Sequence, residues 1–500
     1  MAAEEHTRGS QASDDPFAVR LGKLAALRAH GDEPFKERFD RTHTIAEVRL
    51  AWTDLEPGAD TSDEVAVAGR VVAKREQGKI AFFVVRDASG EIQLFLRSNV
   101  LGPQDFARAL DLDVGDWIGA TGTVSRTQRG ELSVVPATVT LLSKSLRPLP
   151  EKFHGLADVE TRYRQRYLDL IANPGVRHVF ESRFACIAAI RRYMESQGFV
   201  EVETPMLHPI PGGATARPFV THHNALDMDL YLRIAPELYL KRLLVGGFER
   251  VYEINRSFRN EGISVRHNPE FTMLEAYQAF TDLEGMMDLT EGIVTAAAQA
   301  VLGTLQLEYQ GVQVDLTPPW PRRTLISLTS EAAGQDVSFA RSIEDLRNLC
   351  ETHGIPTEPN WGKGKLITEL FEKLVEHTLL QPTLVTDYPL ETSPLARRKM
   401  DEPDLTRRFE LIITGREFAN AFSELIDPID QRERFAAQMR AKAAGDDEAM
   451  GYDEDYLRAM EYGMPPAGGL GIGIDRLVML LTDSPSIRDV LLFPHLRPES

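Results

Sequence analysis

Apolar and polar residues alternate along five short segments between residues 65 and 142, and this pattern predicts β-strands. The segments read VAVAGRVVAKRE, IAFFVVRDASG, EIQLFLR, DWIGATGTVSRT and ELSVVPATVTLL. Turn-forming residues separate them, as at 87–90, where DASG joins two apolar runs. Five strands in this length predict a small barrel of the OB type, an architecture that binds single-stranded nucleic acid.

Outside the predicted barrel, apolar residues recur three and four positions apart, which is typical of amphipathic helices. The clearest helix covers 180–197, where Phe180, Phe184 and Ile187 begin an apolar stripe and Gly198 follows its end. The segment GFVEVETPML after it predicts a strand that ends at Pro205. Further helices are predicted over 17–30, 160–170, 283–303 and 343–378.

The segment 250–278 combines a strand pattern with side chains that suit a nucleotide. Its two β-like runs, 250–259 and 270–277, flank a polar loop and predict an antiparallel hairpin. Alternation places four side chains on one face of the second run: Phe271, Met273, Glu275 and Tyr277. Arg259 and Glu261 share a face at the end of the first run. A guanidinium for phosphate, an aromatic plate for a base and carboxylates for an amine together predict a site for a nucleotide and a cationic substrate.

Three glutamates seven residues apart, Glu410, Glu417 and Glu424, form a second candidate site. Apolar runs on both sides of 414–415 predict a hairpin turn that brings Glu410 close to Glu417. Paired carboxylates beside a triphosphate are typical magnesium ligands. Strict alternation from Glu417 puts Asn420 and Glu424 on the opposite face, so a bulge is required if all three glutamates serve one pocket.

The segment 468–481, GGLGIGIDRLVMLL, predicts a glycine-rich strand that leads into a helix. Gly471 and Gly473 indicate that another group approaches the strand closely. Arg476 falls at the expected helix start, where backbone N–H groups already favour anions. No GxGxxG, Walker A or HxGH string occurs in the chain, so phosphate binding must depend on arginines and magnesium.

Composition adds few further constraints. The chain has 500 residues, a net charge of −19 and only two cysteines, and therefore no disulfide framework or cysteine zinc site. Between 65 and 150 we count 11 Lys and Arg against 8 Asp and Glu, so the N-terminal domain is basic within an acidic protein. The sequence contains no membrane-spanning run and no signal peptide, and we expect a cytoplasmic protein.

The length suggests about three domains. We predict a disordered tail over 1–15, a helical extension over 16–64, the barrel over 65–142 and a linker over 143–175. A catalytic domain follows over 176–500, with a helical insertion at about 336–380.

Together these strings resemble the class II lysyl-tRNA synthetases of the bacterial type. The resemblance is carried by VETPML, IPGGATARPF, RIAPELYLKR, NRSFRNEGISVRHNPEFTM, GDDEAMGYDEDY and GLGIGIDR, and it extends over most of the chain. It implies an α+β fold, with an OB barrel that binds the anticodon and a catalytic antiparallel sheet flanked by helices. It also implies a homodimer that uses ATP and Mg²⁺, up to about three ions per subunit. The implied activity is a ligation in which L-lysine becomes lysyl-adenylate and is then transferred to the 3′ end of tRNA(Lys).

The resemblance also implies roles for individual residues. For ATP they are Arg259 on the α-phosphate, Phe271 stacked on adenine, Glu261 at the adenine amino group, Arg266 and His267 near the β- and γ-phosphates, and Arg476 on the γ-phosphate. Glu410 and Glu417 are implied to hold magnesium, with Glu410 also beside ATP, and Arg259 and Arg476 are the implied catalytic residues. The residues implied to surround lysine are Gly213, Glu237, Glu275, Tyr277, Asn420 and Glu424.

In the barrel, the resemblance implies that Phe82 and Gln93 stack on and read the central base of the anticodon, beside Arg75 and Lys74. Lys74 stands where the family pattern has arginine. This difference weakens the expected anticodon contact at Lys74, because lysine lacks the planar fork of arginine. From the strand pattern alone, the stacking candidates are Phe82, Phe83 and Phe95, and the phosphate candidates are Lys74, Arg75 and Lys79. One of the neighbours Phe82 and Phe83 must face the barrel core.

Two other classes of function remain as alternatives. A non-catalytic tRNA-binding or regulatory protein would share the architecture, but the complete set of Arg259, Arg476, Glu410 and Glu417 argues against it. A ligase that attaches lysine to a protein would resemble the catalytic domain, but the predicted barrel over 65–142 argues against that class.

Overall fold

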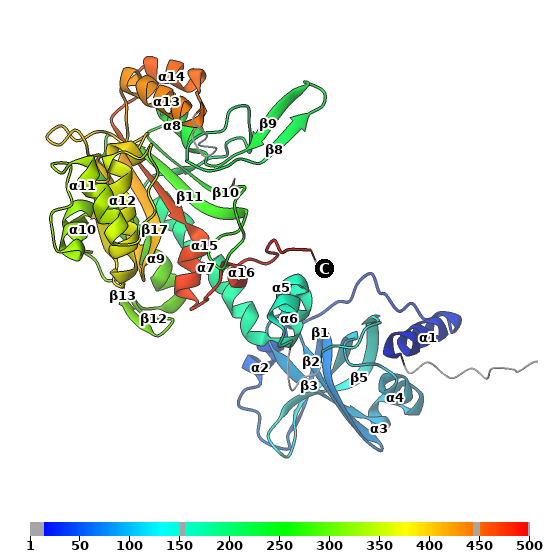
Figure 1. Cartoon of the computed structure of the whole chain (residues 1–500). Helices are drawn as coiled ribbons and strands as arrows, with labels where there is room; N and C mark the ends of the chain where they lie inside the picture. The colour runs from blue at the N-terminus through cyan, green and yellow to red at the C-terminus, as the bar shows by residue number, and fades with distance from the viewer. Residues whose placement is uncertain (1–14, 151–155, 444–450, 499–500) are drawn as a thin grey trace, which may run out of the picture. The chain divides into compact units, whose positions relative to one another are not determined.

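A computed structural model describes residues 15–150, 156–443 and 451–498 of the chain. Within these ranges it separates into two compact units, residues 1–156 and 157–500 (Figure 1). The boundary lies inside the predicted linker, and the structure therefore has two units where length alone suggested about three domains. The predicted tail over 1–15 lies almost entirely outside the described residues.

The first unit contains a closed barrel in the strand order β1-β2-β3-β5-β4. Its elements are α1 (Pro16–Ala29), α2 (Ile45–Ala51), β1 (Asp60–Gln77), β2 (Ile80–Arg86), β3 (Glu91–Arg97), α3 (Ser98–Leu101), α4 (Pro103–Leu110), β4 (Trp117–Arg126) and β5 (Leu132–Ser143). Strands β2 and β3 alternate strictly between buried and half-buried residues, which explains why the sequence pattern located them so well. The five predicted strands are confirmed, although β1 begins five residues earlier than expected, at Asp60.

The second unit is built on an eight-stranded sheet in the order β14-β15-β16-β17-β18-β11-β10-β6. All neighbours are antiparallel except the pairs β14/β15 and β10/β6. The strands of this sheet are β6 (Val200–Glu201), β10 (Arg250–Phe258), β11 (Glu270–Ala279), β14 (Arg322–Thr324), β15 (Thr383–Thr386), β16 (Arg408–Ile413), β17 (Arg416–Ser423) and β18 (Ala467–Gly473). The expected α+β fold is thereby confirmed.

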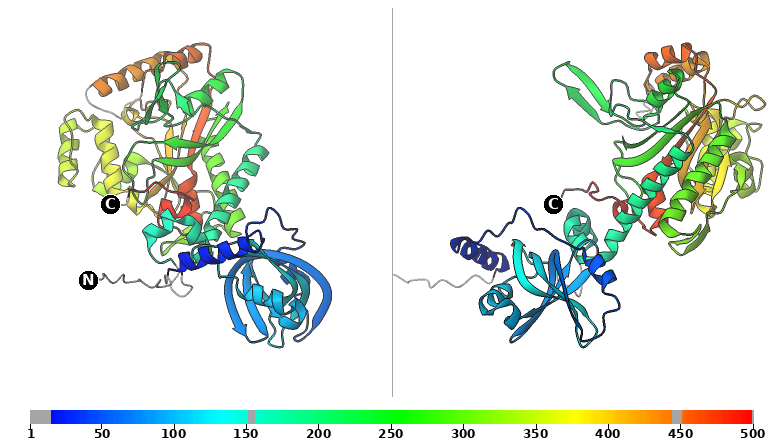
Figure 2. Two further views of the ribbon diagram at one scale, coloured as in Figure 1. Left: turned by 90° about the vertical axis from the view of Figure 1, so that its right-hand side faces the viewer. Right: turned by 180° about the vertical axis from the view of Figure 1, so that it is seen from behind.

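Two small sheets and a set of helices complete this unit. The small-sheet strands are β7 (Leu207–His208), β8 (Val220–His223), β9 (Met228–Leu232), β12 (Gln306–Tyr309) and β13 (Val312–Asp315). The helices before the glutamate hairpin are α5 (Val159–Arg164), α6 (Arg166–Ala172), α7 (Pro174–Ser196), α8 (Glu237–Val245), α9 (Leu283–Leu302), α10 (Leu325–Ala333), α11 (Ile343–Thr352), α12 (Lys363–Leu374), η1 (Glu376–Thr378) and η2 (Leu390–Thr392). Those after it are α13 (Pro428–Ala443), α14 (Glu454–Glu461), α15 (Ile474–Leu481) and α16 (Ile487–Val490). In Figure 1 and in the right-hand view of Figure 2 the β8/β9 hairpin projects away from the main sheet.

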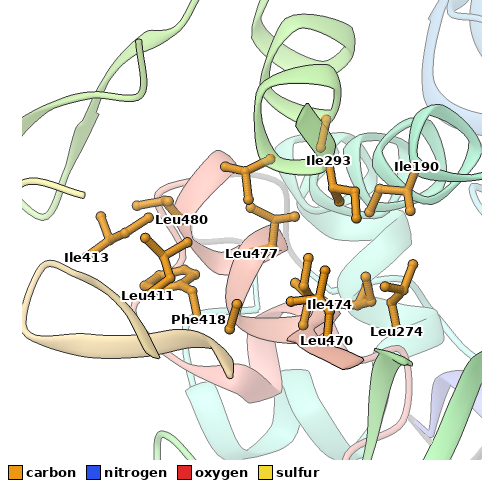
Figure 3. Close-up of a cluster of buried hydrophobic side chains, with 14 of the residues drawn as sticks. Ile190, Leu274, Ile293, Leu411, Ile413, Phe418, Leu470, Ile474, Leu477 and Leu480 are labelled. Carbon is orange, nitrogen blue, oxygen red and sulfur yellow. The ribbon is translucent and has the colours of Figure 1, made fainter. Parts of the chain in front are cut away.

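One face of the large sheet packs against α7, α9 and α15 through the main hydrophobic core. Figure 3 shows this core, in which Ile190 and Ile293 from the helices approach Leu274 and Leu470 from the strands. Because strand residues alternate, the neighbours of Leu274 on β11 point to the opposite face. That opposite face therefore carries the polar side chains of the candidate site.

Several boundaries differ from the sequence-based expectations. The predicted strand at 199–204 shrinks to the two residues of β6, because only Val200 and Glu201 pair with β10. The polar helix expected over 160–170 is two helices, since the chain breaks at Gln165. The helical insertion begins before 336, because α10 packs into one hydrophobic cluster with α11 and α12.

Candidate active site

The predicted hairpin over 250–278 is present, and its loop forms one wall of a pocket. Strands β10 and β11 pair in register from Arg250 opposite Gln278 to Phe258 opposite Glu270. The pairing extends one residue further, because the Arg259 amide donates to the Pro269 carbonyl at 2.8 Å. Every residue expected at the nucleotide except Glu410 lines this single pocket: Arg259, Glu261, Arg266, His267, Phe271 and Arg476.

Arg259 is placed to receive an anion. Its guanidinium lies over the Phe271 ring, 5.0 Å from the ring centroid. Its Nε is buried and has no hydrogen-bond partner among the described residues. A buried donor left unpaired is costly, so a phosphate oxygen in this pocket would satisfy a group that the protein leaves open.

Arg476 lies on the other side of the pocket, in the first turn of α15 as expected. Its Nη1 donates to the Glu417 carbonyl at 2.6 Å and to Glu417 Oε2 at 3.1 Å. Burial lowers the pKa of His267 below its usual value, and the positive charge of Arg476 lowers it further. His267 is therefore neutral at neutral pH, and the fixed positive charge of the pocket comes from its arginines.

The hairpin that bears Glu410 and Glu417 contains the bulge that the sequence required. The register shifts between Leu411 and Ile412, which leaves Phe418 as an extra residue on β17. The parity of the strand therefore changes between Glu417 and Asn420, which lets both side chains serve the same face. The turn at Thr414 and Gly415 has positive φ at both residues, the conformation of a tight two-residue hairpin.

Glu410 and Glu417 face a groove that also contains Glu372 and Glu376. Burial raises the pKa of Glu410 to about 7. The positive charge of Arg408 opposes this increase, and the negative charge of Glu417 adds to it. Desolvation raises the pKa of Glu417, but Arg476 and Arg408 outweigh it and leave the pKa below its usual value. Within the described ranges, no three metal-ligating side chains form a preorganised cluster. Two carboxylates completed by phosphate and water are a coordination typical of magnesium.

The residues expected around lysine lie beside the pocket and are buried, except for the half-buried Asn420. They come from β11, from β17 and the residue after it, from the start of α8 and from the loop that contains Gly213. Glu275 and Asn420 lie opposite Gly471 in the register, while Tyr277 and Phe422 lie opposite Gly469. These glycines leave the space for the site. A Cβ at Gly469 would lie 2.0 Å from Glu424 Oε1 and 2.6 Å from the Tyr277 ring.

Carboxylates dominate this inner cluster. Glu237 begins α8 as predicted, and the Tyr277 hydroxyl donates to Glu275 Oε2 at 3.3 Å. Burial raises the pKa of both Glu275 and Glu424 to about 8. Gly213 also belongs to the cluster, because a Cβ there would lie 3.2 Å from the Glu237 Cβ. Buried carboxylates at this density need cationic partners, which suits an amine substrate.

Sequence reasoning missed two residues that contact the expected set. Lys241 lies between Glu237 and Glu424, with its Nζ 2.5 Å from Glu237 Oε1. Arg408 donates to Glu410 Oε1 at 2.5 Å and to Asn420 Oδ1 at 3.0 Å. The spacing of four between Glu237 and Lys241 on a helix was a signal for the first contact. The spacing of two between Arg408 and Glu410 on one strand was a signal for their contact, whereas the contact of Arg408 with Asn420 depends on pairing between strands.

On the barrel, the structure brings together most of the expected anticodon residues. Phe82 and Phe95 are stacked, with their ring centroids 4.8 Å apart. The Arg75 guanidinium lies 4.9 Å from the Phe82 centroid, and that of Arg97 lies 4.4 Å from the Phe95 centroid. Gln93, half-buried on the outer face of β3, donates to Ser133 Oγ at 2.9 Å.

The remaining barrel candidates lie elsewhere. Phe83 is fully buried in the barrel core, so Phe82 is the neighbour that faces outward. Lys74 does not share the outer face with Phe82, because it pairs with Phe83 in the register. Its ammonium donates to the carbonyls of Leu110 and Leu112 at the end of α4 and forms an ion pair with Glu76. Lys79 is exposed in the turn between β1 and β2.

Comparison with known proteins assigns the family. A profile described as tRNA synthetases class II (D, K and N) matches residues 158–497, and one described as an OB-fold nucleic acid binding domain matches 65–142. The lysine–tRNA ligase of Carboxydothermus hydrogenoformans is 57% identical over 480 residues, which cover 96% of this chain and 97% of the relative. The chain belongs to the lysine–tRNA ligase family.

Other members of the family agree with this assignment. The lysine–tRNA ligase of Moorella thermoacetica is 56% identical over 98% of this chain and 99% of its own length. That of a Nostoc species is 55% identical over 97% of this chain and 88% of its own length. The family is one of class II tRNA synthetases, so the predicted enzyme class is confirmed. None of the described helices of this ligase is long and apolar enough to cross a membrane.

Proposed function

We propose that this ligase joins L-lysine to tRNA(Lys) for translation in two steps at one site. ATP and lysine first form lysyl-adenylate and diphosphate, and lysine is then transferred to the 3′ end of the tRNA. The observation that carries the proposal is the juxtaposition of an arginine-lined pocket with a buried carboxylate cluster on the same sheet face. The first can bind a triphosphate and the second can bind ammonium groups.

In the first step a carboxylate oxygen of lysine attacks the α-phosphorus in line, and the bond from that phosphorus to the bridging oxygen breaks. Arg259 binds the α-phosphate and stabilises its developing charge, since its Nε is the open donor of the pocket. Phe271 stacks on adenine, and Glu261 accepts from the adenine amino group. Arg476, with Arg266 and His267, receives the departing diphosphate. Because the attacking carboxylate is already ionised, no protein general base is needed.

Glu410 and Glu417 would hold magnesium, which supplies positive charge that neutralises the phosphate oxygens. The donor set fits, because the two carboxylates face a common groove and lie close enough for the charge of Glu417 to raise the pKa of Glu410. Arg408 and Tyr388 fix Glu410, since the Tyr388 hydroxyl donates to Glu410 Oε2 at 2.9 Å. The chain's own contribution is thus two oriented carboxylates beside the triphosphate pocket.

The ammonium groups of lysine would bind in the cluster of Gly213, Glu237, Glu275, Tyr277, Asn420 and Glu424. A buried charge needs an opposite partner, and this cluster contains three carboxylates. An anionic amino acid would be rejected by repulsion, so the cluster supports selection of lysine within a family profile that spans D, K and N.

The proposal is tested by ATP–diphosphate exchange with each of the twenty amino acids, followed by charging of bulk tRNA. We expect exchange with lysine alone and lysine-specific charging. No exchange with any amino acid would support a non-catalytic role. Exchange with lysine but no charging of tRNA would favour a ligase that modifies proteins.

The products of the same assay without tRNA can be analysed for dinucleoside polyphosphates. The residues described above neither require nor oppose this side activity.

The barrel would bind the uridine-rich anticodon. The four-tier stack of Arg75, Phe82, Phe95 and Arg97 on its surface offers aromatic and guanidinium planes of the kind on which bases stack. Gln93 lies on the same face and can read a base edge. We assign no anticodon contact to Lys74, because its ammonium is already bound to backbone carbonyls.

Phe82→Ala is expected to raise the KM for tRNA by about 10-fold, because stacking on one base contributes about 1–3 kcal/mol. Lysine-dependent ATP–diphosphate exchange should stay at the wild-type level, since the change lies in the barrel. The matched control is Phe35→Ala, which removes another exposed aromatic side chain from the same unit. Unchanged charging kinetics in Phe82→Ala would contradict the anticodon contact.

We also propose that the ligase acts as a homodimer in the cytoplasm, where tRNA is charged. Large apolar side chains on α7 and the segment after it are about half exposed: Phe184 at 56%, Val200 at 51% and Met206 at 50%. Large apolar side chains left exposed in this way suit a contact with another protein surface. Sedimentation of the purified protein should give the mass of two chains.

A further inference from the structure

Lys241 is a fully buried lysine whose ammonium lies inside the acidic cluster proposed to bind lysine. Its Nζ is 2.5 Å from Glu237 Oε1 and forms an ion pair with Glu424 Oε2. The rings of Phe422 and Tyr277 are also close to it, with centroids 5.3 Å and 5.9 Å from Nζ. Two carboxylates and two aromatic rings thus surround one internal ammonium.

The second oxygen of Glu424 is left open. Glu424 is only 1% exposed, and its Oε1 has no hydrogen-bond partner among the described residues. This oxygen lies beside Gly469, at a place that a side chain there would block, since a Cβ at Gly469 would be 2.0 Å from it. A buried carboxylate oxygen without a donor is unfavourable, so the site is incomplete until a ligand donor arrives.

The charges in the cluster indicate what that ligand supplies. Glu237, Glu275 and Glu424 contribute three negative charges when ionised, and Lys241 contributes one positive charge. The remainder of about two negative charges matches the α- and ε-ammonium groups of a lysyl adenylate.

We propose that Lys241 is a positioning residue for lysine recognition, which holds the carboxylates of Glu237 and Glu424 in place and leaves Glu424 Oε1 for the substrate ammonium. The inference rests on the proposed lysine site. It adds to that site an internal cation that does not itself contact the substrate. Lys241 acts through Glu424, and its own ammonium stays bound to the protein.

The anchoring of Lys241 argues against its acting as a plug that substrate displaces. It follows Glu237 by one turn on α8, and its neighbours Leu240 and Leu244 are buried in a hydrophobic cluster. The helix also packs against β11 and α14, and the Lys241 side chain has no exposed surface. A plug would compete with substrate, whereas a positioning residue would support its binding.

Several charged and titratable groups face this cluster and share in its pH dependence. They are Glu237 on α8, Glu275 and Tyr277 on β11, Tyr456 on α14, Arg408 on β16, Glu253 on β10 and Arg259 after β10. Burial disfavours the charged form of Lys241, but Glu237 and Glu424 outweigh it and raise its pKa, so Lys241 remains protonated. Burial raises the pKa of Glu237 and Glu424, and the positive charge of Lys241 opposes that increase.

The test compares Lys241→Met with wild type by ATP–diphosphate exchange over a range of pH. Loss of the internal cation should raise the pKa of both glutamates, so the acidic limb of kcat/KM for lysine should move upward by about 1–3 pH units. At neutral pH the KM for lysine should rise about tenfold or more, while the KM for ATP stays within about twofold of wild type. Lys241→Arg keeps the charge and should keep the limb near its wild-type position.

Arg242→Met is the matched control, because it removes the next cation on α8 together with its 2.8 Å ion pair to Asp453. It should leave the acidic limb where it is. A lower KM for lysine in Lys241→Met would identify a plug, and an unmoved limb would identify a merely structural residue; either result overturns the proposal. If Lys241→Met does not fold, Lys241→Gln replaces it. The acidic limb of kcat/KM for lysine should then move upward in Lys241→Gln and stay in place in Lys241→Arg. Lysine-dependent exchange by wild type is measured first, so that a failure of the proposed function is distinguishable from a failure of this inference.

Discussion

Arg259→Ala should reduce lysine-dependent ATP–diphosphate exchange by about 10³-fold, because it removes the donor aimed at the charge that develops on the α-phosphate. Its guanidinium is oriented over Phe271, and its buried Nε has no partner among the described residues. The loss should appear in kcat more than in the KM for lysine, since the carboxylate cluster is untouched. Exchange kinetics with saturating lysine and ATP measure the effect.

The matched control is Arg256→Ala. Arg256 lies on β10, three residues before Arg259, and its side chain is exposed. Thermal melting of both variants should stay close to wild type, since neither arginine carries a network of core contacts. Near-wild-type exchange in Arg259→Ala would refute its assignment to the α-phosphate.

Glu424→Gln should weaken lysine by about 10²-fold in KM and leave the KM for ATP nearly unchanged. The substitution preserves shape but removes a fully buried negative charge beside the position proposed for a substrate ammonium. The pKa of Glu424 is raised to about 8 by burial, so below that pH the wild-type side chain is itself increasingly protonated and lysine binding should weaken. Saturation curves for each substrate, measured in the exchange assay, give the two constants separately.

Glu454→Gln serves as the control for this charge removal. Glu454 forms a 2.9 Å surface ion pair with Arg432 and is half exposed, so its loss should leave both KM values unchanged. A Glu424→Gln variant that lost lysine and ATP equally would argue for general disruption of the sheet and against an ammonium contact.

Much of the architecture could be read from the sequence because the local pattern and the tertiary structure agree. Strands β2 and β3 of the barrel alternate cleanly, since one face of each is buried and the other half-buried. The strand-to-helix transition at Gly473 and the hairpin turn at Thr414 depend on backbone chemistry that is local in sequence. Where pairing was short, as in β6, the apolar run alone gave too long a strand.

The sequence by itself determined the residue types of the site: an arginine and an aromatic on one hairpin, three spaced glutamates, and glycines where other groups approach. The sequence shows which of these residues share a strand face and where glycines allow a close approach, because both features depend on only a few neighbouring residues. Only the tertiary structure decided which of them meet. The bulge at Phe418 brought Asn420 to the face of Glu417, and α8 carried Lys241 between Glu237 and Glu424. The tertiary structure also decided the role of Lys74, because its ammonium donates to a backbone carbonyl just after α4. Partners in a buried cluster come from segments far apart in the chain, and their charges are fixed by burial, which no local pattern encodes.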